Sequence, residues 1–162
     1  MPPRASRRLA VLLLPDEPSA PRGLGTIAFA ALEARSLTAR VVIGGNGLVG
    51  PEERDAIAFV SNRQGGFSVR CPLPPSAPGG SPPILTRQFA GALERWRSGA
   101  ERSVVCECGT RHDLAALAFA PPAGFARTWL RIEDAASGDV DPVALTAVAE
   151  VFGGVRILLR RG

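Results

Sequence analysis

The sequence contains no lysine and no tyrosine, so all 19 basic residues among its 162 are arginine. The absence of lysine excludes a Schiff base with a carbonyl substrate, attachment of pyridoxal phosphate and a P-loop that holds nucleotide phosphates. Long apolar runs are also missing. No segment approaches the ~20 apolar residues of a membrane helix, so we expect no membrane partner.

Histidine and cysteine are scarce. A single histidine excludes zinc hydrolase sites built from several histidines, and no G-x-S-x-G motif supplies a serine nucleophile. Three cysteines are an odd number, unlike the disulfide framework of a small secreted protein. The apolar run at residues 9–14 is shorter than the core of a secretion signal and is followed by Pro15. We therefore expect a buried first strand, reduced thiols and a cytoplasmic location.

Aromatic residues are few, with two tryptophans and seven phenylalanines. They offer no obvious platform on which bases would stack. The net charge of +4 and the pI of about 10.1 are typical of nucleic-acid binding, but the arginines are scattered along the chain. Arginines on a solvated surface explain this charge better, and we do not expect nucleic acid as a partner.

The residues that are present alternate between strand and helix patterns. Short apolar runs predict strands near residues 9–14, 39–43, 67–70, 103–107, 128–132 and 155–159. Helical spacing predicts helices between most of them, and such alternation is typical of β-α-β units. We therefore predict a single α/β domain over residues 1–162. It would hold a mostly parallel sheet of about six strands with helices on both faces, a Rossmann-like or flavodoxin-like three-layer sandwich.

Three segments between these strands carry strong local signals. Residues 51–64 begin with proline and acidic residues and are followed by two glycines, which predicts a helix. Asp141 followed by Pro142 predicts the capped start of another helix. Residues 72–83 hold six prolines and two glycines, which predicts an exposed loop insertion that tolerates deletion.

The stretch SVVCECGTRHDL, residues 103–114, concentrates most of the chemistry. It holds Cys106, Cys108, Arg111 and the single histidine, His112. One interpretation is structural, because cysteine is commonly buried as a small hydrophobe and a histidine can stabilise a loop. A metal site and a reactive thiol are the two alternatives.

The metal interpretation adds the remaining cysteine, Cys71. Cys71, Cys106, Cys108 and His112 supply four ligands, the number that a closed tetrahedral zinc site requires. In an extended strand a C-x-C pair would hold its sulfurs roughly 7 Å apart. Zinc therefore requires the chain to bend at Cys108–Gly109, which glycine permits.

The thiol interpretation rests on a resemblance. VVCECGTR resembles the active-site loop of rhodanese-like sulfurtransferases, in which an apolar strand leads to cysteine, two residues, glycine, one residue and arginine. The resemblance implies that Cys106 carries a persulfide in a cradle of backbone N–H groups and that Arg111 closes the loop. The Gly-His-Ile stretch found upstream in that family is absent here.

Together these patterns favour a non-catalytic binding or assembly component with a protein partner and a small structural zinc site. The alternative is a small rhodanese-like enzyme of sulfur transfer that uses the Cys106-x4-Arg111 loop. The metal content of the protein separates the two.

Overall fold

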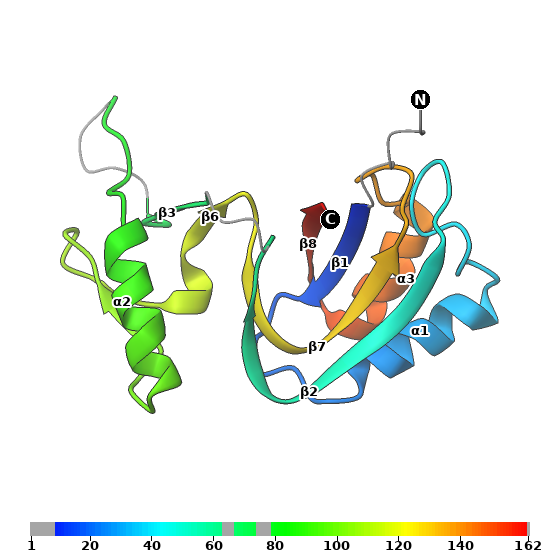
Figure 1. Ribbon diagram of the computed structural model, residues 1–162, viewed down its shortest axis with the longest axis horizontal. Coiled ribbons are helices and arrows are strands. Elements are labelled where there is room, and N and C mark those ends of the chain that lie inside the picture. The colour runs from blue at the N-terminus through cyan, green and yellow to red at the C-terminus, as the bar shows by residue number, and fades with distance from the viewer. Residues whose placement is uncertain (1–8, 63–66, 74–78, 162) are drawn as a thin grey trace, which may run out of the picture. The chain divides into compact units, whose positions relative to one another are not determined.

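The structure is a computed structural model that describes residues 9–62, 67–73 and 79–161. Contacts within the chain divide it into two compact units (Figure 1). Unit 1 comprises Met1–Gln64 and Ala123–Gly162, and unit 2 comprises Gly65–Pro122. Unit 2 is thus inserted, in sequence, between two parts of unit 1. Each unit has its own secondary structure and is described separately.

Unit 1 is built around a four-stranded antiparallel sheet in the order β2-β7-β1-β8. Its elements are β1 (Leu9–Pro15), α1 (Leu24–Ala34), β2 (Leu48–Val60), β7 (Gly124–Glu133), α3 (Pro142–Phe152) and β8 (Val155–Arg161). Each helix joins two strands that are separated by a third. This β-α-β-β-α-β order is the split β-α-β topology known as ferredoxin-like.

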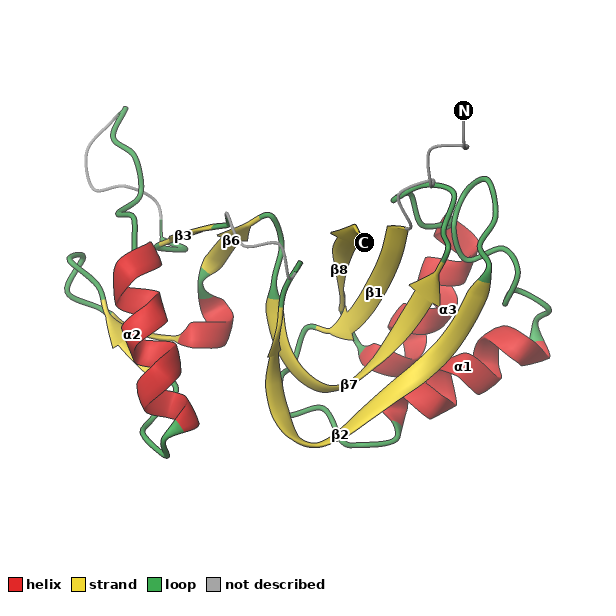
Figure 2. Ribbon diagram, in the orientation of Figure 1, coloured by secondary structure: helices red, strands yellow, loops and turns green. Residues whose placement is uncertain are grey.

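The two helices of unit 1 lie on the same face of its sheet (Figure 2), and both contribute to one apolar cluster. Ala28 and Leu32 of α1 and Ala147 and Val148 of α3 are buried in it with alternate residues of the strands, such as Val11. The intervening residue Leu12 belongs to a second buried cluster. Successive side chains of a strand point to opposite faces, so β1 is apolar throughout because both of its faces are covered.

The predicted mostly parallel sheet of about six strands is wrong, and so is the Rossmann-like or flavodoxin-like three-layer sandwich. Among the described residues, all strand pairs are antiparallel and the strands belong to three sheets. A continuous apolar run shows that a strand is covered on both faces, as parallel strands usually are. It does not show the direction of the neighbouring strand, and that inference failed here.

Two local predictions in unit 1 also fail. The helix predicted for residues 51–64 is largely the strand β2, and the strand predicted for residues 39–43 is replaced by turns and a single bridge from Val42 to Val140. Pro51 is tolerated in β2 because β2 lies at the edge of the sheet. Glu52 in this strand pairs with Arg131 of β7 at 2.9 Å. Glu52 and Glu53, two of the acidic residues that indicated a helix start, therefore have partners in β7 across the sheet.

The described residues of unit 2 form one α-helix, one 3₁₀ helix and four strands of three residues each. Its elements are β3 (Ser68–Arg70), α2 (Thr86–Arg97), β4 (Ser103–Val105), β5 (Arg111–Asp113), the 3₁₀ helix η1 (Leu114–Ala116) and β6 (Ala118–Ala120). β3 pairs with β6 and β4 pairs with β5. The predicted strand at 103–107 ends earlier, at Val105, so that Cys106 begins a turn.

The interior of unit 2 is aromatic but small. Phe67, Phe89 and Phe119 meet edge to face, with ring centroids 5.2–6.4 Å apart. Of the proline-rich stretch 72–83, residues 74–78 lie outside the described residues, and the described part holds no helix. Pro83, the last residue of this stretch, accepts a hydrogen bond on its carbonyl from the backbone N–H of Cys71 at 3.0 Å.

Among the described residues of both units, no helix has the length and apolar character that a membrane span requires.

Candidate metal centre

The hairpin of β4 and β5 places three of the four candidate ligands. Cys106 and Cys108 lie in its turn, and His112 lies in β5 opposite Val104. The N–H of Cys106 donates to the carbonyl of Thr110 at 3.0 Å, and that of Gly109 donates to the carbonyl of Cys106 at 2.9 Å. Gly109 has φ +84°, a conformation that a residue with a side chain rarely adopts. The chain turns at the glycine where the metal hypothesis required a bend.

The fourth candidate ligand comes from a distant part of the sequence. Cys71 directly follows β3, whose residues are held by the chain that leads into α2. The N–H of Leu85 donates to the carbonyl of Val69 at 2.8 Å, and Arg70 forms a bridge with Ile84. These bonds fix the end of β3 and hence the position of the Cys71 thiol.

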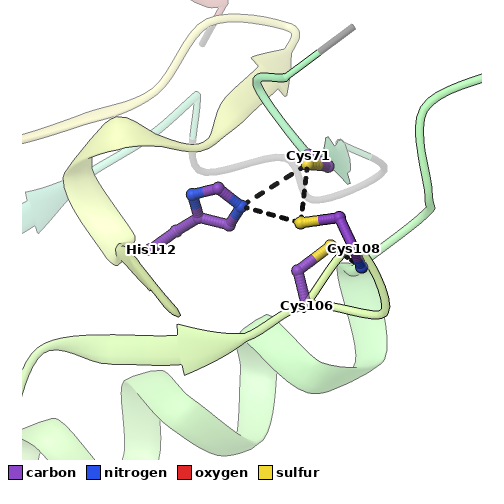
Figure 3. A group of neighbouring side chains, drawn as sticks. All are labelled: Cys71, Cys106, Cys108 and His112. Atoms are coloured by element: carbon purple, nitrogen blue, oxygen red, sulfur yellow. Dashed lines mark hydrogen bonds between the residues drawn. The ribbon is translucent and has the colours of Figure 1, made fainter. Parts of the chain in front are cut away.

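All four side chains converge (Figure 3). Their ligand atoms lie within 4.8 Å of one another. Nε2 of His112 lies 3.4 Å from Sγ of Cys71 and 3.5 Å from Sγ of Cys108, and these two sulfurs are 3.8 Å apart. Cys71, Cys106 and His112 are buried, whereas Cys108 is exposed.

The three distances among Cys71, Cys108 and His112 match those of a tetrahedral zinc site, and Sγ of Cys106 lies within 4.8 Å of all three ligand atoms. With Zn–S bonds of about 2.3 Å and Zn–N bonds of about 2.0–2.1 Å, tetrahedral angles place two sulfurs about 3.8 Å apart and sulfur and nitrogen about 3.6 Å apart. Three thiols and one imidazole are a known donor set for structural zinc. The residues therefore fit zinc in both chemistry and spacing.

The two thiols in the turn differ in their environment. The backbone N–H of Thr110 is the main reason why the pKa of Cys108 falls to about 6, and contacts with Cys106 and His112 act in the same direction. The N–H of Cys108, 3.4 Å from Sγ of Cys106, lowers the pKa of Cys106. Burial and the sulfurs of Cys108 and Cys71 outweigh this bond and raise the pKa of Cys106 to about 11.

Arg111, which the sulfurtransferase resemblance places over the loop, has a different partner. Its guanidinium donates to Glu101 at 2.9 Å, and both side chains are largely exposed. Arg102 and Asp113 form a second, two-bonded pair across the ends of the hairpin, at 3.0 and 3.2 Å. Both ion pairs hold the hairpin, and in this structure neither places a guanidinium over a thiol.

Sequence reasoning missed a groove beside the hairpin. A cavity of about 540 Å³ lies between α2 and β4, and arginines of the helix line it. A signal was present, because Arg87, Gly91 and Arg95 recur every four residues on a predicted helix and so share one face. Glycine in the middle of such a face leaves space where a side chain would otherwise stand.

Comparison of the chain with models of protein families, with curated proteins and with solved structures gives no match. Function is therefore inferred from the residues of the chain and their geometry.

Proposed function

We propose that this chain is a non-catalytic binding component whose smaller unit is held together by one structural zinc ion. Cys71, Cys106, Cys108 and His112 would bind the ion. The proposal rests on the distances among Nε2 of His112 and the sulfurs of Cys71 and Cys108. These distances, 3.4, 3.5 and 3.8 Å, agree with the distances between ligand atoms in a tetrahedral zinc site.

A structural role is supported by the number of ligands. Four protein donors complete the tetrahedral shell of zinc, whereas catalytic zinc sites keep one position open for water or substrate. Two of the three thiols and the imidazole are also buried.

The small size of unit 2 supports the same role. Gly65–Pro122 is shorter than the roughly 70–80 residues below which a single apolar core rarely stabilises a fold, and its strands are only three residues long. A metal that binds the folded chain would add the missing free energy. β3 pairs with β6, whereas β4 and β5 form a separate hairpin. Zinc would link β3 to that hairpin.

Sulfur transfer is less well supported. A persulfide carrier has to be reached by a sulfur donor and an acceptor, and its thiolate is the nucleophile. Cys106 is 3% exposed and the pKa of its thiol is raised to about 11, which opposes both requirements. Exposed Cys108 has the lower pKa, but it does not occupy the cysteine position of the resemblance.

The test is the metal content of protein purified without added metal or chelator. We expect about one zinc per chain by elemental analysis, and a cobalt(II)-substituted protein with the visible absorption of tetrahedral thiolate coordination. Cys71→Ser and His112→Gln should each lower the bound zinc and the melting temperature. Thr110→Ser is the matched control in the same turn and should leave both unchanged. Metal-free protein that cannot be loaded, with Cys106 open to alkylation, would overturn the proposal in favour of the thiol alternative.

A further inference from the structure

The groove between α2 and β4 has the features of a peptide-docking site. Its volume is about 540 Å³, and it is lined by residues of α2, by Ala100 and Glu101 ahead of β4, by Ser103, Val104 and Val105 of β4, and by Arg111 of β5. It lies wholly within unit 2, on the same hairpin that supplies three of the candidate zinc ligands. We call it the α2–β4 groove.

The helix side of the α2–β4 groove is positively charged and recessed. Arg87, Gly91 and Arg95 follow one another at four-residue spacing, so they lie along one stripe of α2. A Cβ at Gly91 would lie 3.2 Å from Nη1 of Arg95, which shows that the arginine side chain reaches over the glycine. Within the described parts of the chain, no carboxylate forms an ion pair with Arg87 or Arg95. Both arginines are exposed. The Glu101 carboxylate, which also lines the groove, is paired with Arg111 at 2.9 Å, so the two helix arginines are available for an acidic ligand.

The strand side of the α2–β4 groove is an edge of β4 without a partner strand among the described residues, although the N–H of Ser103 there donates to the carbonyl of Glu101 at 3.0 Å. Hydrogen bonds from Cys106 to Thr110 and from Leu114 to Arg102 show that alternate residues of β4 bond to β5. By that alternation, the N–H and carbonyl of Val105 point to the opposite edge. Among the described strands, β4 pairs with β5 alone. The Val105 side chain is 62% exposed, which leaves room for an apolar neighbour.

From these two sides we infer that the α2–β4 groove binds an extended acidic segment of a partner protein. The segment adds as a strand to the free edge of β4, and Arg87 and Arg95 bind its carboxylates. The inference rests on the proposed function and names the chemistry of the partner.

The spacing of the charges fits an extended peptide. Eight helical residues separate the two arginines by about 12 Å along α2. Two side chains four residues apart on one face of a strand are about 13 Å apart. Single-stranded nucleic acid, the other polyanion, normally adds base stacking on aromatic side chains, and none of the residues lining the groove is aromatic.

The test uses the full-length, zinc-loaded protein and a fluorescent, capped heptapeptide of alternating glutamate and valine. We expect saturable binding by fluorescence anisotropy that weakens with added salt. Gly91→Leu, which fills the groove at a half-buried helix position and displaces the Arg95 guanidinium that lies 3.2 Å from the new Cβ, should weaken binding at least tenfold. The double change Arg87→Glu and Arg95→Glu should do the same. Ala90→Leu and Arg97→Glu are matched controls on α2 outside the lining and should change binding less than twofold.

Two altered probes test the mode of binding. A peptide with glutamine in place of glutamate should bind at least tenfold more weakly, because it lacks the carboxylates. A peptide with N-methyl groups on alternate amides keeps its charge but cannot pair as a strand, and it should also lose binding.

The inference is overturned if the wild-type protein does not bind the peptide, if Gly91→Leu binds it equally well, or if a twelve-residue oligothymidylate binds more tightly. Zinc content and melting temperature are measured on the same preparations. Failure of peptide binding by a chain that holds one zinc would therefore overturn the groove proposal and leave the metal centre standing.

Discussion

At the scale of single residues, Glu53 of β2 acts on a helix that is distant in sequence. Helix α1 begins after Gly23, which has no side chain to cap it. The Glu53 carboxylate accepts hydrogen bonds from the N–H groups of Gly23 at 2.8 Å and Thr26 at 3.3 Å, and from the hydroxyl of Thr128 at 3.0 Å. A strand residue thus satisfies N–H groups at the start of a helix, where negative charge is favourable.

We predict that Glu53→Gln lowers the free energy of unfolding by about 1–3 kcal/mol, because hydrogen bonds to a charged acceptor are replaced by weaker ones. Urea denaturation measures the change. Glu33→Gln removes the same charge from an exposed position of α1 and should change the free energy by less than about 0.5 kcal/mol. Equal effects of the two variants would show that Glu53 acts only through net charge.

The thiols predict how zinc binding depends on pH. A thiol has to lose its proton before it binds zinc. With a pKa of about 11, Cys106 is protonated at neutral pH without metal, whereas Cys108, with a pKa of about 6, is mostly thiolate. Zinc binding near pH 7 therefore releases the Cys106 proton, and the dissociation constant should fall at least about tenfold for each unit rise in pH.

Competition with a chromophoric chelator, calibrated at each pH, measures this dependence. The slope should steepen below about pH 6, where Cys108 also carries a proton that zinc must displace. A dissociation constant that does not change between pH 7 and 8 would contradict a bound Cys106 thiolate.

At the scale of elements, the β4–β5 hairpin depends on its turn. A Cβ on Gly109 would meet no atom within 4 Å, so a side chain there is opposed only by the φ of +84°. We predict that Gly109→Ala destabilises the zinc-bound hairpin by about 1–2 kcal/mol, the cost of a left-handed conformation for a residue with a Cβ. Gly109→Asn should cost less, because asparagine adopts this conformation more readily.

Thermal unfolding of the zinc-loaded protein and zinc affinity together measure this change. Gly50→Ala is the control, since that glycine also has open space around it and no positive φ. If Gly109→Ala and Gly50→Ala have the same effect, the turn conformation is not what the glycine provides.

At the scale of the whole molecule, the two units should respond differently to loss of metal. Unit 1 has extensive apolar clusters, whereas unit 2 joins two short sheets through the candidate zinc ligands. We predict that a chelator abolishes hydrogen-exchange protection in β4 and β5 while protection in β1 and β7 persists. Added zinc should restore it. Simultaneous loss of protection in both units would show that unit 1 also depends on the metal.

The sequence predicted several elements well because their signals are local. The strand predicted at residues 9–14 is β1, and the helix predicted after Asp141 is α3. The Asp141 carboxylate accepts from the N–H groups of Val143 and Ala144 at 3.1 Å, as the capping pattern indicated. The Asp141 cap and the helical periodicity of α3 involve residues close together in sequence. The Pro51 helix start was a local signal too, but the pairing of β2 with β7 overrode it.

The candidate ligands were named from the sequence because only three cysteines and one histidine are present. That they converge was decided by the tertiary structure, since Cys71 reaches the hairpin through the pairing of β3 and the segment before α2. Metal binding itself stays a prediction. The groove beside α2 was missed, because its strand side exists only when β4 packs beside the helix.

The sequence by itself determined the candidate donor atoms, the absence of lysine chemistry, the Asp141 cap of α3 and the apolar strand β1. Only the tertiary structure decided the direction of the strands and the partners of Glu52 and Glu53. The physical reason is range. A strand is stabilised by hydrogen bonds to a neighbour that can lie anywhere in the chain, so the same apolar run suits a parallel or an antiparallel sheet. In the same way, the acidic pair Glu52 and Glu53 suits the start of a helix, but it also suits a strand that lies beside an arginine and the N-terminus of another helix.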